Sequence, residues 1–123
     1  MKRVLVVDDD DDMRQLMVLL LSETYEVSTA CDGRQGLEMA RQVRPDLIVL
    51  DLLMPRMHGF EVCQHLRADA ELNAVKVLIS SSKSYRHDVN TAVDETGADD
   101  YIVKPFDVAD FKARVAALLA EAP

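Results

Sequence analysis

Five short apolar runs alternate with segments of helical spacing, and this alternation constrains the fold of the chain more than any other feature. The runs are rich in valine and isoleucine, and two of them, 4–7 and 47–50, lead directly into aspartates. This pattern is typical of strands buried on both faces of a parallel sheet. The predicted strands lie at residues 4–7, 25–29, 47–50, 75–80 and 101–103.

Between and after these runs, apolar residues recur three and four positions apart, which predicts amphipathic helices. Gly97 is placed to end the fourth helix as a C-cap, and Asp107 is placed to cap the start of the last one. The predicted helices lie at residues 11–22, 33–43, after Gly59 with Val62, Cys63 and Leu66 on one face, 85–96, and from 107 onward.

Five consecutive strand–helix units predict an α/β fold with a parallel sheet and helices on both of its faces. The chain has 123 residues, which is enough for one buried core and too few for two. No linker, repeat or low-complexity stretch interrupts the pattern. We therefore expect residues 1–123 to form one domain.

Charge and hydropathy exclude several classes of function. The formal net charge is −8, so the chain should repel phosphate backbones, and we expect no direct binding of nucleic acid. No apolar run approaches the roughly 20 residues of a membrane helix, and the amino terminus does not resemble a signal peptide. We expect a cytoplasmic protein. Cys31 and Cys63 are expected to be buried small residues without a disulfide or metal.

Polar residues follow four of the five predicted strands, at the edge where open α/β sheets place their sites. Strand 4–7 is followed by Asp8 and Asp9, and strand 47–50 by Asp51. The fourth strand ends in the serines at 80–82, and the fifth in Lys104. Each residue alone has a structural explanation as a solvated loop or strand end, and we accept that explanation for the acids at 10–12. The joint placement favours a site.

Three carboxylates at neighbouring strand ends repel one another and call for a counterion. An all-oxygen site suits Mg²⁺. A carboxylate can also attack phosphorus and form an aspartyl phosphate, while a metal, a lysine and a hydroxyl neutralise the phosphoryl oxygens. The residues therefore indicate phosphoryl chemistry.

Taken together, these motifs resemble the receiver domain of two-component response regulators over essentially the whole chain. The segments that carry the resemblance are 6–9, 51–55 with Gly59, the serine of the fourth strand, 97–101 and 104–106. The resemblance implies a doubly wound (βα)5 three-layer sandwich with strand order 2-1-3-4-5.

The resemblance also implies a role for individual residues. Asp51 would accept the phosphoryl group. Mg²⁺ would be bound by Asp9, Asp51 and the main-chain carbonyl of Leu53, with Asp8 assisting through water. Lys104 would pair with Asp51 at rest and with the phosphoryl group afterwards. The peptide bond between Lys104 and Pro105 would be cis.

The hydroxyl that would contact the phosphoryl group has two candidates. Reading along the fourth strand indicates Ser81, with Ser82 as the small following residue, whereas counting back from Lys104 indicates Ser82. We favour Ser81. Tyr101 would couple its rotamer to that hydroxyl, although an amphipathic ring at a sheet edge explains it equally well.

Two residues depart from the usual family pattern. His58 stands where many members have aspartate, and we interpret it as a tolerated loop residue. Leu53 offers an attacking water no polar help, which predicts slow self-dephosphorylation.

The implied function is a phosphorelay switch rather than an enzyme with a separate substrate. A sensor histidine kinase or a histidine phosphotransfer protein would supply the phosphoryl group. The face formed by the fourth helix, fifth strand and fifth helix would then change, to control an output protein or domain or to form a homodimer. Whether the chain is a stand-alone regulator or the amino-terminal part of a longer protein stays open.

Three alternatives remain. The first is a degenerate receiver that only binds partners. The second is a haloacid-dehalogenase-type phosphatase, which would need a second aspartate where Leu53 stands. The third is a flavodoxin-like or dinucleotide-binding module, which would need a phosphate-binding loop after the first strand, where further aspartates stand instead.

Overall fold

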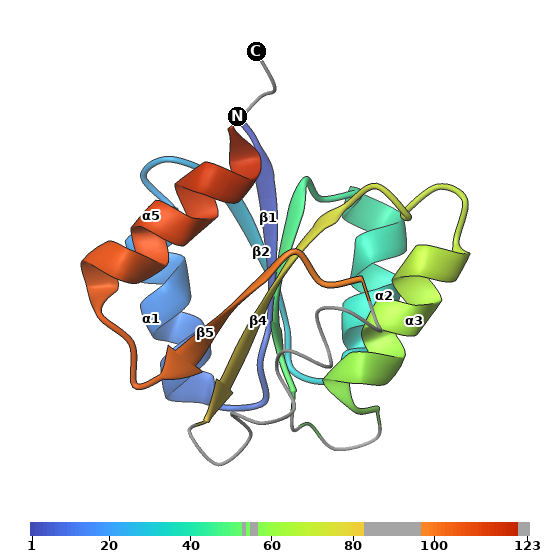
Figure 1. Ribbon diagram of the computed structural model, residues 1–123, viewed down its shortest axis with the longest axis horizontal. Helices are drawn as coiled ribbons and strands as arrows, with labels where there is room; N and C mark the ends of the chain where they lie inside the picture. The colour runs from blue at the N-terminus through green and yellow to red at the C-terminus, as the bar shows by residue number, and fades with distance from the viewer. Residues whose placement is uncertain (53, 55–56, 83–96, 121–123) are drawn as a thin grey trace.

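The computed structural model describes residues 1–52, 54, 57–82 and 97–120, and the predicted helix at 85–96 lies outside the described residues. Strands and helices alternate along the chain (Figure 1). The elements are β1 Arg3–Val7, α1 Asp11–Leu21, β2 Glu26–Ala30, α2 Gly33–Val43, β3 Leu47–Asp51, α3 Gly59–Ala68, β4 Lys76–Ser82, β5 Asp100–Lys104 and α5 Val108–Leu119.

All described strands pair in parallel, in the order β2-β1-β3-β4-β5. This confirms the predicted sheet. Figure 1 shows α1 and α5 covering one face of the sheet and α2 and α3 covering the other. β2 lies on one side of β1, and β3 and the later strands lie on the other side. The topological switch point of the sheet is therefore between β1 and β3, and ligand sites of such sheets form at the carboxyl ends of these two strands.

Apolar side chains alternate between two cores, one on each side of the sheet. In β1, Leu5 and Val7 join the core under α2 and α3, whereas Val4 and Val6 join the core under α1 and α5. Every residue of β3 is buried. Burial on both faces explains why these strands read as continuous apolar runs rather than as alternating ones.

Side-chain caps set where the helices begin. Asp10, Asp32 and Asp107 accept main-chain N–H bonds at the starts of α1, α2 and α5, so the predicted cap at Asp107 is confirmed. His58 caps α3 in the same way through Nδ1, a role that we did not predict. Gly97 has a φ of 79°, the left-handed conformation expected of a C-cap glycine.

Two expectations need correction. β4 continues to Ser82, two residues beyond the predicted end, because parallel pairing with β5 extends as far as Lys104. Cys63 is buried as expected, but Cys31 is exposed. Cys31 directly follows the last residue of the edge strand β2, where the sheet gives it little cover. None of the helices in the described part of the chain combines the length and apolarity that crossing a bilayer requires.

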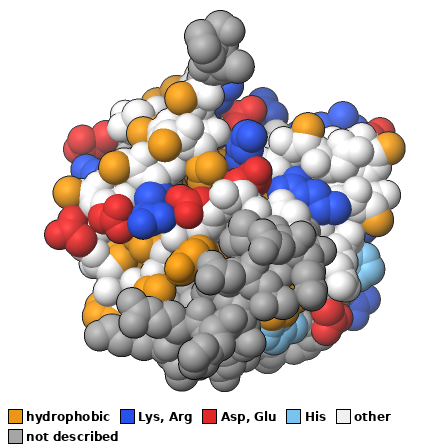
Figure 2. Space-filling view, in the orientation of Figure 1, with side chains coloured by type: hydrophobic (Ala, Val, Ile, Leu, Met, Phe, Trp, Pro, Cys, Tyr) orange, Lys and Arg blue, Asp and Glu red, His pale blue; other side chains and the backbone are white. Residues whose placement is uncertain are grey.

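The outer surface of β5 and α5 carries interleaved charges. Figure 2 shows acidic and basic side chains next to one another over α5, and the ion pairs there join Arg114 to Asp100 and to Asp110. Arg114 also donates to the main-chain oxygen of Tyr101. These contacts fasten α5 to the strand that ends at Lys104.

Candidate functional site

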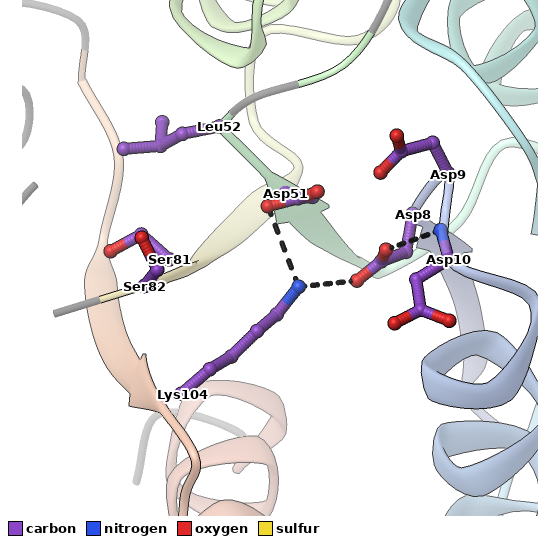
Figure 3. Close-up of a pocket in the computed structure, with 8 residues that line it drawn as sticks. All are labelled: Asp8, Asp9, Asp10, Asp51, Leu52, Ser81, Ser82 and Lys104. Atoms are coloured by element: carbon purple, nitrogen blue, oxygen red, sulfur yellow. Dashed lines mark hydrogen bonds and ion pairs between the residues drawn. The ribbon is translucent and has the colours of Figure 1, made fainter. Parts of the chain in front are cut away.

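The carboxyl ends of four strands meet around one cavity of about 210 Å³ (Figure 3). Asp8 follows β1, Asp51 ends β3, and Lys104 ends β5, so parallel pairing alone brings them to one edge. The residues that line the cavity are Asp8, Asp9, Asp10, Asp51, Leu52, Ser81, Ser82 and Lys104. The predicted site residues Asp8, Asp9, Asp51, Ser81 and Lys104 are therefore neighbours.

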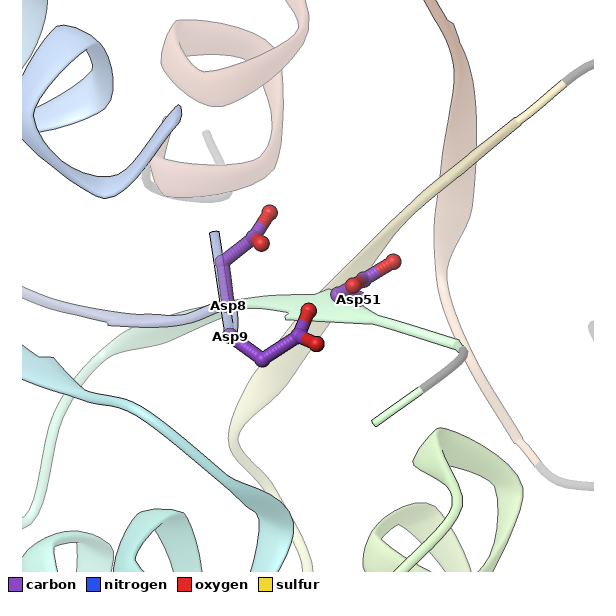
Figure 4. A group of neighbouring side chains, drawn as sticks. All are labelled: Asp8, Asp9 and Asp51. Carbon is purple, nitrogen blue, oxygen red and sulfur yellow. The ribbon is translucent and has the colours of Figure 1, made fainter. Parts of the chain in front are cut away.

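Three carboxylates form a compact cluster in this cavity. Asp8, Asp9 and Asp51 each place one oxygen within 4.8 Å of the others (Figure 4). Asp8 and Asp51 are only 1% and 8% exposed, whereas Asp9 is exposed. Hard oxygen donors at this spacing suit a divalent cation such as Mg²⁺, which keeps several of its own waters. The residues present therefore fit the metal that the sequence predicts.

Lys104 supplies positive charge to the cluster, and it pairs with Asp8 as well as with the predicted partner Asp51. Its Nζ lies 2.7 Å from Asp8 Oδ2 and 3.5 Å from Asp51 Oδ1 (Figure 3). The resting hydrogen bond is thus to Asp8, and Asp51 receives only the longer ion pair. Asp8 is the more deeply buried acid, so its charge has the greater need of a partner.

The pKa of the Asp51 carboxyl is raised from 3.8 to about 7, and burial is the largest cause. The negative charge of Asp8, and the hydrogen bond and charge of Asp9, contribute to this rise, while Lys104 opposes it. Burial and the two neighbouring carboxylates together thus outweigh the lysine. A cation bound by the cluster would favour the ionised, nucleophilic form of Asp51.

Hydrogen bonds hold both the backbone and the side chain of Asp8. Its N–H donates to the oxygen of Ala30, and its Oδ1 accepts from the N–H of Asp10 at 2.9 Å. Its main-chain oxygen accepts from the guanidinium of Arg14 at 2.9 Å. The contact of Arg14 with Asp8 was not predicted from the sequence. The feature that could have indicated it is the position of an arginine one turn into a helix that begins within an acidic run.

The serines of β4 occupy different environments. Ser81 is 1% exposed and lines the cavity, and its hydroxyl has no hydrogen-bond partner among the described residues. Ser82 also lines the cavity but is exposed. Ser80 is buried, and it does not line the cavity. A buried hydroxyl that faces a polar cavity without a partner is available to a ligand.

Comparison with known proteins identifies the family. The response regulator receiver domain family matches residues 4–116. The chain belongs to this family. The architecture agrees, since the Vibrio cholerae chemotaxis protein CheY4 superposes with a TM-score of 0.89 at 32% identity, over 97% of this chain and 99% of that one.

Two curated relatives of this receiver domain are named as DNA-binding regulators. The DNA-binding dual master transcriptional regulator RpaA of Synechocystis is 43% identical over 120 residues, or 97% of this chain and 49% of the relative. The DNA-binding response regulator MtrA of Mycobacterium tuberculosis is 41% identical over 119 residues, or 96% and 50%. The chain thus spans about half the length of these relatives.

The other predicted residues that the structure describes do not line the cavity. Tyr101 is half-buried against the core under α2 and α3 and does not line the cavity. The peptide bond between Lys104 and Pro105 is cis. Leu53 lies outside the described residues. His58 caps α3 and contacts the ring of Phe60, so it has a structural role at the end of the loop.

Proposed function

We propose that this receiver domain, formed by residues 1–123, accepts a phosphoryl group on Asp51 in a Mg²⁺-dependent reaction. The observation that carries the proposal is one cavity in which Asp51 lies among two further carboxylates, the Lys104 ammonium and a Ser81 hydroxyl that has no partner in the described part of the chain. Few other functions require an acidic cluster, a cation and a buried hydroxyl at one sheet edge.

The phosphoryl donor in this proposal is a phosphohistidine of a sensor histidine kinase or of a histidine phosphotransfer protein. An oxygen of Asp51 attacks phosphorus, the new O–P bond forms, the P–N bond to the histidine breaks, and the imidazole leaves with the electron pair of that bond. Asp9, Asp51 and the carbonyl of Leu53 would bind Mg²⁺, with Asp8 assisting through water. The ion would neutralise charge on the transferring oxygens.

Two side chains of the chain would hold the product. Lys104 would move from Asp8 toward the phosphoryl oxygens, a short displacement because its Nζ already lies 3.5 Å from Asp51 Oδ1. The Ser81 hydroxyl would donate to another phosphoryl oxygen and would satisfy its own unmet hydrogen bond. Both contacts exist only with phosphate bound, so they would bias the domain toward its signalling state.

The signal would leave through the face that includes β5 and α5. Ser81 pairs in register with Val103, so a shift of the serine toward phosphate reaches the strand that carries Tyr101 and Lys104. A change on this face would control an output domain, a separate partner protein or a homodimer. Both relatives are named as DNA-binding, and the name of RpaA favours transcription as the output. The net charge of −8 makes DNA contact by this domain itself unfavourable.

Intact-mass analysis after incubation with acetyl phosphate tests the proposal. We expect a Mg²⁺-dependent gain of one phosphoryl group in the wild type and none in Asp51→Asn. Asp32→Asn is a matched control, because Asp32 is a buried acid after β2 whose capping role asparagine can take over. This control should be phosphorylated like the wild type.

The other outcomes separate the alternatives. No adduct in the wild type, after a phosphohistidine donor has also been tried, would favour a degenerate receiver that only binds partners. An adduct that persists in Asp51→Asn would show that another residue is the acceptor. Multiple turnover of a small phosphate ester would favour the phosphatase.

A further inference from the structure

Arg14 links α1 to the strand end that carries the acidic pair. Its Nη1 donates to the main-chain oxygen of Asp8 at 2.9 Å, and its Nη2 pairs with Asp11. The side chain is only 20% exposed, so it lies against the protein rather than in solvent. A charged donor to a carbonyl oxygen makes one of the stronger kinds of hydrogen bond.

We propose that Arg14 is a positioning residue for the cation site and that it acts through the peptide group between Asp8 and Asp9. This inference rests on the proposed Mg²⁺-dependent function and adds a residue that lies outside the cavity lining. In this proposal Arg14 does not itself bind the cation or the phosphoryl group, since it does not line the cavity. It fixes the backbone from which Asp9 reaches the cluster.

The geometry explains why Asp9 depends on such a contact. A peptide group is planar, so holding the oxygen of Asp8 also sets the direction of the following N–H and Cα of Asp9. Asp8 itself is held by its burial and by its bonds to Ala30 and Asp10. Asp9 is exposed, so packing does not fix its carboxylate. Its distance to the other two acids therefore depends on the backbone orientation that Arg14 maintains.

Positioning and electrostatics predict opposite effects for loss of Arg14. Removing a positive charge near an acidic cluster makes the local potential more negative, which by itself tightens the binding of a cation. Releasing the Asp8–Asp9 peptide lets the three carboxylates separate, which weakens binding. Outer-shell contacts of this kind are typically worth about 10-fold to 100-fold in metal affinity. The sign of the change thus identifies the mechanism.

Calorimetric titration with Mg²⁺ tests the proposal on the intact chain. We expect the Mg²⁺ dissociation constant to rise about 10-fold in Arg14→Gln. Arg3→Gln is the matched control, because Arg3 also donates to a main-chain oxygen, that of Val43 at 2.8 Å, but near the opposite end of β1. It carries the same change in net charge, and its dissociation constant should stay within about twofold of the wild type.

A second readout is the amide spectrum of the metal-free protein. The Asp9 resonance should shift in Arg14→Gln and not in Arg3→Gln. Mg²⁺ binding in Arg14→Gln that is unchanged or tighter would overturn the positioning role. If that variant does not fold, Arg14→Lys is the second test, because lysine keeps the charge but lacks the forked guanidinium. Several-fold weaker Mg²⁺ binding in Arg14→Lys would support the positioning role, and unchanged binding would overturn it. A wild type that binds no Mg²⁺ would instead overturn the proposed function, and the positioning role with it.

Discussion

Replacing Asp51 with asparagine should change how the stability of the metal-free protein depends on pH. The folded state raises the pKa of this carboxyl to about 7, chiefly by burial, whereas its ordinary value is 3.8. The protonated form therefore stabilises the fold fully below about pH 3.8, and this contribution is lost as the pH rises through about 7. Asparagine stays neutral throughout and avoids that loss.

The size of the effect follows from the two pKa values. Each pKa unit corresponds to about 1.4 kcal/mol, so the difference between 3.8 and about 7 corresponds to roughly 4 kcal/mol. The free energy of unfolding of Asp51→Asn, minus that of the wild type, should therefore grow by roughly 4 kcal/mol between about pH 4 and pH 8. The attraction of Lys104 is already included, since it lowers the same pKa.

Urea denaturation at several pH values, with a chelator present, measures this difference directly. The same measurement in saturating Mg²⁺ is the comparison, because a cation that binds the ionised cluster stabilises the folded state. At about pH 8 it should restore much of the wild-type stability and should raise the stability of Asp51→Asn by less. Parallel stability curves for the two proteins without Mg²⁺ would refute the reasoning. A difference that shrinks as the pH rises would refute it as well.

Four further substitutions have expected outcomes. Arg67→Lys should lower the free energy of unfolding by about 2 kcal/mol, because the guanidinium donates to several carbonyl oxygens near the starts of β4 and β5. The same exchange at the exposed Arg44 is the control and should change the free energy of unfolding little. Gly59→Ala should cost about 2 kcal/mol, since its Cβ would lie 2.5 Å from a main-chain oxygen. His58→Asp should add about 1 kcal/mol as a better cap of α3, and denaturant titrations measure all three. Leu53→Asn should shorten the lifetime of the phosphorylated form in a dephosphorylation time course, and an unchanged or longer lifetime would contradict the prediction.

Local pattern was enough to predict the strands and the parallel sheet because the central strands β1 and β3 are buried on both faces, whereas the strand order was implied by the family resemblance. The run from Leu47 to Leu50 is continuous and apolar, and every residue of β3 is buried. The end of β4 could not be predicted in this way. Ser81 is 1% exposed within the strand, yet its polarity gives no apolar signal, and only pairing with β5 extends the strand that far.

The composition of the site was predictable, whereas its contacts were not. Parallel strands bring their carboxyl ends to one edge, so Asp8, Asp51 and Lys104 had to meet. Lys104 donates its hydrogen bond to Asp8 rather than to Asp51 because of side-chain geometry, which the spacing of residues along the sequence does not determine. The contact of Arg14 with a main-chain oxygen and the cap formed by His58 also depend on the course of the loops.

The closer contact of Lys104 with Asp8 affects the charge balance of the whole cluster. Because its Nζ lies 2.7 Å from Asp8 and 3.5 Å from Asp51, the lysine mainly compensates the deepest charge and leaves the proposed acceptor the less compensated of the two buried acids. Burial is the main cause of the raised pKa of Asp51, and the attraction of Lys104 offsets it only in part. Ionisation of Asp51 near neutral pH therefore favours a second positive charge in the cavity, and a divalent cation bound by Asp9 and Asp51 would supply it. By this argument, a proton on Asp51 and a cation in the cavity compete, so Mg²⁺ binding should strengthen as the pH rises through about 7.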